Sequence, residues 1–418
     1  MPLTSYICFA LFILLFLTLF RKNTDVFSPA RLFIMIWALA IGLVELKLSR
    51  YQKVWSSYSW IVLMISLFSM VLGFFIVYVI NIGKPLKSIN EIRRITKDFT
   101  FDSNLLFRYT VLLFIAYLIS YIVSAIVIGY IPLFTKYPGV ARNDWGIFGF
   151  GLFVQSFPSI IYLIVLYFLI TKKATFKKII LTIVFIITFL TYAFLLQRYY
   201  IALAIISIAA TVYYLTNMLR LRNVILISIV GLAIMFGMTF IRLTGTIANY
   251  LYYLSQMKFS VKYAYLTEPY MYIVMNIENF VHAASKIEKF TYGLLSFDFV
   301  FALTGLKHVM AEYLALPKFP HLITNNYNTY TMFFVYYWDY GILGITLFPL
   351  LIGMIFSFAY YKMRTKPDLN SIAIYSIFVF VISFSFFVPV LTFLHFVFNL
   401  IVIYFITALV TEKSKPIY

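Results

Sequence analysis

Three arginines stand where apolar stretches of the chain begin or end. Arg198 lies in a polar break between two apolar runs, Arg242 closes the run after them, and Arg142 follows a stretch broken by Gly and Pro. An arginine at the edge of hydrocarbon is costly unless it pairs or reaches water, and a guanidinium holds phosphate oxygens by two parallel hydrogen bonds. Each arginine is therefore either an interfacial anchor or part of an anion site. For Arg142 the plainer alternative is a loop contact with Asp144.

A second polar group lies where the chain is predicted to return to the membrane. The run 324–331 is dense in amides, hydroxyls and aromatic rings, and it includes Asn325, Asn326 and Tyr327. Such groups suit a ligand that carries many hydroxyls, whereas the plainer alternative is an N-terminal cap for the helix that follows. Asp339, further on, is a lone carboxylate near the membrane, and for it we expect an arginine partner.

Titratable groups between positions 243 and 329 include candidates for a general base. Glu278 and His282 are spaced i, i+4 and would share one face of a helix. Glu268 and His308 complete this set, and the alternative for all four is a solvated surface residue. For His395, in the last apolar pair, we favour a buried, hydrogen-bonded ring over a proton relay. The chain has one cysteine, no HExxH motif and no external acidic pair with DxD spacing, so we expect neither a metal nor another cofactor.

The elements that position these residues must lie in a membrane. Of the 418 residues, 63% are hydrophobic and only 11% are charged, and the mean hydropathy is +0.96. Soluble domains carry about 25% charged residues, so no water-soluble core could hide this apolar surface. The net charge of +19 would favour nucleic acid as a partner of a soluble chain. Here it reflects Lys and Arg at the cytoplasmic ends of spans, and no nucleic-acid partner is expected.

The apolar runs predict an all-α polytopic membrane protein with about eleven transmembrane helices, since each crossing needs about 20 apolar residues. The predicted spans are 3–20, 30–47, 59–82, 105–131, 147–170, 179–197, 200–217, 224–242, 341–361, 371–388 and 391–411. In the long segment 243–329, apolar residues recur at helical spacing between Met271 and Val281, so we expect amphipathic helices on the outer membrane face. The chain thus divides into 1–242, 243–329 and 330–418.

Lys and Arg in the short loops predict the orientation of the chain. Twenty of the 33 Lys and Arg residues fall in six alternate segments, and the short loops of the other side hold only six. Because cytoplasmic loops carry the excess of Lys and Arg, the C-terminus is predicted to be cytoplasmic. The three arginines, the general-base candidates and the Asn-rich run then lie on the external face.

Taken in order, these stretches resemble the oligosaccharide repeat-unit polymerases, the Wzy-type or O-antigen polymerase family of bacterial surface-glycan assembly. The resemblance covers most of the chain in topology. In sequence it covers 129–134 with Arg142 downstream, Arg198 and Arg242 at the external ends of their spans, the long external segment, and 325–329 leading to 339–344. Family members often carry Gly or Ser just before the first of these arginines, where this chain has Gln197.

The resemblance implies a metal-independent membrane glycosyltransferase of GT-C-like architecture in the bacterial inner membrane. Its substrate would be an undecaprenyl-diphosphate-linked glycan, joined into a surface polysaccharide on the periplasmic or extracytoplasmic face. Membrane lipids, a chain-length regulator and a flippase are the partners implied. The catalytic candidates are Arg198, Arg242 and Asp339. The substrate-binding candidates are Arg142, Tyr199, Asn325, Asn326 and Tyr327. The general-base candidates are Glu268, Glu278, His282 and His308.

Two other functions stay open at this point. An O-antigen ligase-type transferase uses nearly the same chemistry with a lipid A acceptor, and a transporter or flippase would move lipid-linked sugars. Transporters commonly show internal repeats and charged residues at the membrane midplane, whereas this sequence shows no repeat and its polar residues cluster at one face. The polymerase is therefore the function that the sequence favours.

Overall fold

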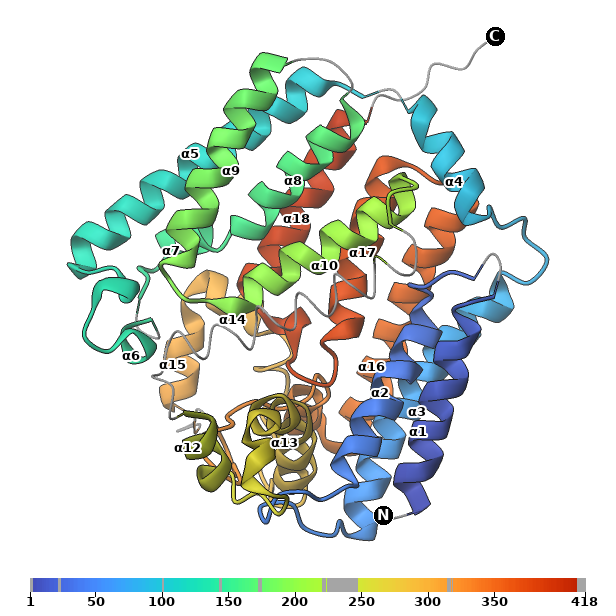
Figure 1. Cartoon of the computed structure of the whole chain (residues 1–418), viewed down its shortest axis with the longest axis vertical. Helices are drawn as coiled ribbons and strands as arrows, with labels where there is room; N and C mark the ends of the chain where they lie inside the picture. Colours follow the sequence, from blue (N-terminus) through green and yellow to red (C-terminus); the bar gives the residue numbers. More distant parts are fainter. Residues whose placement is uncertain are drawn as a thin grey trace. The chain divides into compact units, whose positions relative to one another are not determined.

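The computed structural model is built from helices (Figure 1). It describes residues 3–21, 24–99, 101–142, 145–171, 175–219, 223, 247–313, 317 and 319–411. Within these residues the only paired extended positions are two isolated bridges, Ser49 with Met257 and Phe101 with Thr411. The prediction of an all-α protein is confirmed for the described part of the chain.

The first of two compact units combines three separate stretches of sequence, Met1–Lys84, Phe236–Tyr361 and Val381–Leu394. Its elements are α1 (Leu3–Thr18), α2 (Pro29–Val44), α3 (Ser57–Ile80), α12 (Ile247–Leu254), η3 (Val261–Leu266), α13 (Thr267–Ala284), α14 (Asp298–Thr304), α15 (Leu306–Tyr313), most of α16 (Phe334–Thr365) and η4 (Val390–Thr392). Both α2 and α3 pack against α13, and α13 is largely buried. The helical periodicity predicted between Met271 and Val281 lies within it.

The second unit comprises Pro85–Met235, Lys362–Phe380 and His395–Tyr418. Its elements are α4 (Ile89–Ile95), η1 (Thr96–Asp98), α5 (Ser103–Ile128), η2 (Pro132–Phe134), α6 (Pro138–Ala141), α7 (Phe150–Val154), α8 (Phe157–Ile170), α9 (Thr175–Ala193), α10 (Arg198–Leu215), much of α17 (Leu369–Ser383) and nearly all of α18 (Leu394–Val410). Contacts with α5, α9 and α10 surround α8, which makes it the central helix of this unit (Figure 1).

Six of the described helices are long and apolar enough to cross a membrane. They are Ser57–Ile80, Ser103–Phe134, Phe150–Ile170, Phe176–Ala193, Arg198–Leu215 and Phe334–Thr365. Four shorter apolar helices, α1, α2, α17 and α18, coincide with further predicted spans, while the predicted span 224–242 lies outside the described residues. The chain is therefore a helical membrane protein, and the total of eleven spans stays a prediction.

Local sequence signals set several helix ends. Asp102 caps α5 by accepting hydrogen bonds from the amides of Asn104 and Leu105, both at 2.9 Å, which satisfies donors that lack a partner within the helix. At the other end of α5, Gly129 takes a left-handed conformation with φ of +80°, a frequent way for helices to end. This left-handed turn starts the Gly- and Pro-containing stretch that leads to Arg142.

Two glycines allow α3 and α16 to approach closely. A Cβ atom on Gly73 would lie 2.2 Å from the Leu350 carbonyl oxygen, and one on Gly353 would lie 2.4 Å from the Met70 carbonyl oxygen. Small residues are common at helix contacts in membranes, because lipid supplies no hydrophobic driving force and close backbone packing must replace it. The first unit therefore depends on these glycines for the contact between its two longest apolar helices.

Candidate functional site

The turn between α9 and α10 carries the first predicted catalytic residue. Helix α9 ends at Ala193, and Arg198 is the first residue of α10. Within the turn, Leu196 has φ of +57°, a left-handed conformation that costs a residue other than glycine about 1–3 kcal/mol. Such strain persists where the surrounding contacts determine the backbone, and it is frequent at functional sites.

A second segment reaches this turn from the chain beyond α5. The amide of Leu133 donates to the Phe194 carbonyl at 3.0 Å, and Nη1 of Arg142 donates to the Leu196 carbonyl at 3.1 Å. Two predicted site residues, Arg142 and Arg198, are thereby brought to one turn. The stretch 129–134 and the two arginines were linked in the sequence only by resemblance, and here hydrogen bonds connect them.

Uncharged polar side chains form a network beside this turn. Nε2 of Gln155 donates to Oε1 of Gln197 at 2.9 Å, and the Tyr192 hydroxyl lies 3.0 and 2.9 Å from the side-chain oxygens of these glutamines. The Asn399 side chain donates to the Gln155 carbonyl at 2.8 Å and accepts from the Ser159 hydroxyl at 2.5 Å. The network joins the turn to α8 and α18 and so holds the start of α10 in place.

Aromatic rings complete the surroundings of Arg198. The ring centroids of Tyr200 and His395 are 4.9 Å apart, and those of Tyr199 and His395 are 6.1 Å apart. His395 is half-buried, and its carbonyl accepts a hydrogen bond from Asn399 at 2.7 Å. Neither His395 nor Asn399 was predicted to lie near Arg198, and their polarity within an apolar helix was the only sequence signal that pointed to such a position.

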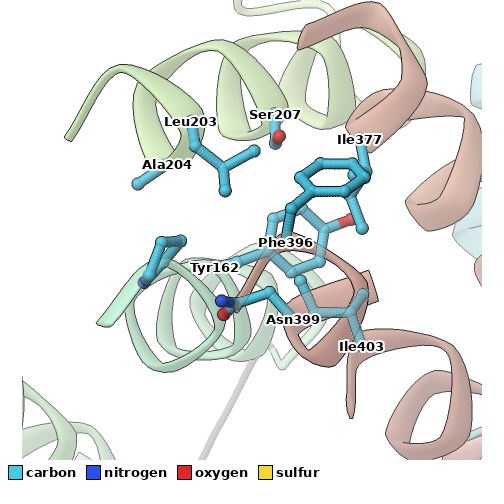
Figure 2. Close-up of a pocket in the computed structure, with 9 residues that line it drawn as sticks. Tyr162, Leu203, Ala204, Ser207, Ile377, Phe396, Asn399 and Ile403 are labelled. Carbon is cyan, nitrogen blue, oxygen red and sulfur yellow. The ribbon is translucent and has the colours of Figure 1, made fainter. Parts of the chain in front are cut away.

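A small cavity in the core of the second unit is excluded as a sugar site by its size. It has a volume of about 10 Å³ and is lined by residues of α8, α10, α17 and α18, among them Tyr162, Ser207 and Asn399 (Figure 2). The Ser207 hydroxyl is buried and has no hydrogen-bond partner among the described residues. The volume suits a single water molecule, which would satisfy this hydroxyl.

Asp339 is fully buried in the first unit. Its carboxylate accepts hydrogen bonds from the Thr291 hydroxyl, from the amide of Leu295 at 3.2 Å and from the amide of Ser296 at 2.5 Å. The sequence predicted an arginine as its partner, whereas the contacts described for Asp339 come from a hydroxyl and two amides. They fasten the segment 291–296 to α16, next to the break in that helix at Gly341. Asp339 is thus held as an anchor for this segment.

The Asn-rich run 324–331 ends three residues before α16, which begins at Phe334. Asn325 and Asn326 are exposed, whereas Tyr327 is buried and its hydroxyl lies 2.8 Å from that of Ser255. The Asn279 side chain of α13 donates to the Tyr327 carbonyl at 2.7 Å. The run is therefore a loop tied to α13 that exposes the side chains of Asn325 and Asn326, and the structure gives no support to the alternative of a helix cap.

Glu278 is buried, so its interpretation as a solvated surface residue is wrong. Its carboxylate pairs with Nζ of Lys47 at 2.7 Å and accepts hydrogen bonds from Gln52 at 3.2 Å and from the Trp55 indole at 2.8 Å. Burial raises the pKa of Glu278, and Lys47 opposes that rise. Because Lys47 also lies 3.3 Å from Glu45, this ionic cluster fastens the segment between α2 and α3 to α13.

The remaining predicted residues are dispersed. Glu268 is buried at the start of α13, and His282 is half-buried one turn after Glu278. His308 belongs to α15, and Arg242 lies outside the described residues. Among the described residues, no three His, Cys, Asp or Glu side chains are grouped so that they could hold a metal ion. The sequence also led us to expect that Asn325, Asn326, Tyr327 and Asp339 line one external cavity with the arginines opposite them. This expectation joins residues of two units and stays a prediction.

We expect Lys47→Met to destabilise the protein by about 3 kcal/mol near neutral pH, because it leaves a buried carboxylate without its cation. The loss should shrink as the pH falls, since the pKa of Glu278 is already raised and protonation removes the uncompensated charge. Thermal unfolding of the purified protein at two pH values measures both effects. Adding Glu278→Gln to Lys47→Met should restore most of the stability, and the exposed Lys262→Met serves as the control. Equal melting temperatures for Lys47→Met and Lys262→Met would contradict the assignment.

Comparison of the chain with models of known families, with curated proteins and with solved structures finds no match.

Proposed function

We propose that this protein polymerises undecaprenyl-diphosphate-linked oligosaccharide repeat units into a surface polysaccharide by metal-independent glycosyl transfer. In this proposal it lies in the bacterial inner membrane with a cytoplasmic C-terminus, and the reaction takes place on the external face. The observation that carries the proposal is the meeting of Arg142 and Arg198 at the N-terminal end of α10, where Arg142 donates to the Leu196 carbonyl at 3.1 Å.

The chemistry of this turn fits a departing diphosphate. In the proposed reaction a hydroxyl of the acceptor sugar attacks the anomeric carbon of the donor, the bond from that carbon to the diphosphate oxygen breaks, and a general base takes the hydroxyl proton. Negative charge grows on the diphosphate, and preorganised cations lower the barrier most where charge develops. Two guanidinium groups and the positive end of the α10 dipole would supply this stabilisation.

An apolar groove beside the same turn suits the polyprenyl tail of such a substrate. The groove has a volume of about 420 Å³ and is lined by Tyr121, Ile122, Ala125, Ile126, Gly129, Tyr130, Ile131 and Phe134. The Phe134 ring lies 5.3 Å from that of Phe194 in the α9–α10 turn. A lipid lying in the groove would therefore bring its diphosphate toward Arg142 and Arg198.

Deletion of the gene in its native host, followed by gel analysis of surface glycan, tests the proposal. We expect the ladder of long chains to disappear while a single repeat unit is still attached to its acceptor. Loss of all surface glycan would favour the ligase or flippase instead, and an unchanged ladder would overturn the proposal. Plasmid-borne expression of the intact chain should restore the ladder.

The proposed orientation is testable with reporter fusions. A reporter joined after Lys173 or Arg222 should give a cytoplasmic signal, because these positions lie on the side that holds most Lys and Arg residues of the short loops. A reporter inserted near Lys289 should give an external signal. A cytoplasmic signal at Lys289 would remove the general-base candidates and the Asn-rich run from the proposed external site.

Asn326→Ala should slow polymer formation by roughly tenfold, about the value of one hydrogen bond to substrate, without changing the melting temperature. Asn326 is exposed, and its side-chain amide contacts only the Thr324 hydroxyl, at 3.3 Å, among the described residues. The contrasting control is Asn279→Ala, which removes buried hydrogen bonds to the loop and should lower the melting temperature. A stability loss with normal chain length in Asn326→Ala would remove this residue from the site.

A further inference from the structure

The turn between α12 and η3 is fastened to the end of a helix that can cross the membrane. Residues 45–56 join α2 to α3, and α3 is long and apolar enough to span a bilayer. Because this joining segment directly precedes a span, it lies at a surface of the bilayer. Any part of the chain that hydrogen-bonds to the segment lies at the same level.

A row of hydrogen bonds connects the α12–η3 turn to this segment. They run from the Arg50 amide to the Gln256 carbonyl, from the Lys258 amide to the Leu48 carbonyl, from the Ser49 hydroxyl to the Ser255 carbonyl and from the Tyr51 hydroxyl to the Leu254 carbonyl, at 3.0, 2.8, 2.6 and 2.9 Å. Both Ser49 and Ser255 are fully buried. The turn, and with it α12 and η3, is therefore held at the surface of the bilayer.

The outward side of α12 and η3 is aromatic and apolar. The two elements contact each other, and both pack against α13 (Figure 1). On the side away from α13, Tyr250, Tyr253 and Tyr265 expose 61%, 68% and 59% of their surface. Val261, Tyr263 and Leu266 are exposed as well. We name these six residues the α12–η3 surface. Apolar side chains gathered on one exposed face mark an interaction surface.

The charge of this part of the chain suits lipid phosphates. Residues 247–266 include no Asp or Glu and two lysines, Lys258 and Lys262, and both lysines are exposed. Nζ of Lys262 lies 4.8 Å from the centre of the Tyr263 ring. Tyrosine rings are enriched at the level of the headgroups, and a lysine there keeps its apolar stem against the ring while its ammonium reaches the polar layer.

We propose that the α12–η3 surface lies in the headgroup layer of the bilayer that the protein spans. Val261 and Leu266 offer no hydrogen bond to a sugar, whereas both suit the boundary between headgroups and acyl chains, into which amphipathic surfaces reach by about 5–10 Å. The Ser255 hydroxyl lies 2.8 Å from that of Tyr327, so contact with lipid would also fix the level of the Asn-rich run above the bilayer. This contact with lipid does not depend on the proposed function.

Depth-dependent fluorescence quenching tests the proposal, with the full chain in nanodiscs of phosphatidylethanolamine and phosphatidylglycerol. Cys8 is replaced by Cys8→Ser, and Tyr253→Cys or Tyr265→Cys then supplies a single position for a fluorophore. We expect a nitroxide on the lipid headgroup to quench both labels about twofold more than a nitroxide deep in the acyl chain. The control Phe68→Cys, at a 68% exposed position in the middle of α3, should show the opposite order.

Three results would overturn the proposal. Quenching by aqueous iodide without any effect of the lipid nitroxides would place the surface in water. Iodide quenching that a neutral oligosaccharide relieves would make it a sugar-binding surface, and protection from every quencher would make it a contact between copies of the chain. Melting temperatures establish that each labelled variant is folded, and the two positions lie on different elements, so either one suffices. If gene deletion leaves the glycan ladder intact while lipid nitroxides still quench the labels, the proposed function fails and the lipid contact stands.

Discussion

Arg198→Ala is expected to lower the rate of polymer formation by roughly 100-fold or more, the usual effect of removing one preorganised donor from a site where charge develops. Arg198 opens α10, and Arg142 is hydrogen-bonded to the turn directly before it, so the two guanidinium groups would act on the same diphosphate. The measurement is the rate of chain growth from purified lipid-linked repeat units, with the membrane level of each variant checked in parallel.

Conservative and remote variants sharpen this test. Arg198→Lys should keep only part of the activity, because an ammonium group cannot form the two parallel hydrogen bonds of a guanidinium. Arg142→Ala should also lower the rate of chain growth. Arg50→Ala, which alters an exposed arginine of the segment between α2 and α3, should leave this rate unchanged. The rate of chain growth in Arg242→Ala tests the third predicted arginine in the same way. Full activity of Arg198→Ala would remove the α9–α10 turn from the mechanism.

Gly341→Ala is expected to destabilise the first unit by about 2–4 kcal/mol, since the backbone there suits glycine and the space is filled. Gly341 interrupts α16 with φ of +60° and ψ of −138°, and an added Cβ would lie 3.0 Å from the Phe290 ring. The break leaves the carbonyls of Trp338 and Asp339 to accept hydrogen bonds from the amides of the loop 291–292, at 3.1 and 3.2 Å. Alanine would strain both the backbone and this docking.

Thermal unfolding and the yield of folded protein from membranes measure the effect of Gly341→Ala. The matched control is Gly139→Ala, because no atom lies within 4 Å of a Cβ built on Gly139. That variant should unfold at the temperature of the unaltered protein. Equal melting temperatures for the two variants would mean that the break in α16 is not held by glycine.

The local properties of the chain were readable from its sequence. Hydropathy predicted the apolar helices, because burial in hydrocarbon depends on the composition of a continuous stretch. Ten of the eleven predicted spans fall on helices of the structure, although 147–170 is divided between α7 and α8. Gly129 indicated the end of α5, because glycine adopts a left-handed backbone conformation more readily than other residues do. Arg142, Arg198 and Asp339 were likewise selected as candidate site residues by their type and position, since an isolated charge near an apolar run is conspicuous.

Only the tertiary structure decided which of these residues meet. Glu278 pairs with Lys47, which precedes it by 231 residues, and its apparent exposure on a helix face gave no sign of that partner. Asp339 is held by amides of the loop between α13 and α14 rather than by an arginine, and His395 packs on Tyr200 from a helix near the end of the chain. Periodicity and hydropathy indicate which residues of one segment are exposed to water or lipid. The contacts between segments that are distant in sequence depend on complementary shape and charge, and no local pattern carries that information.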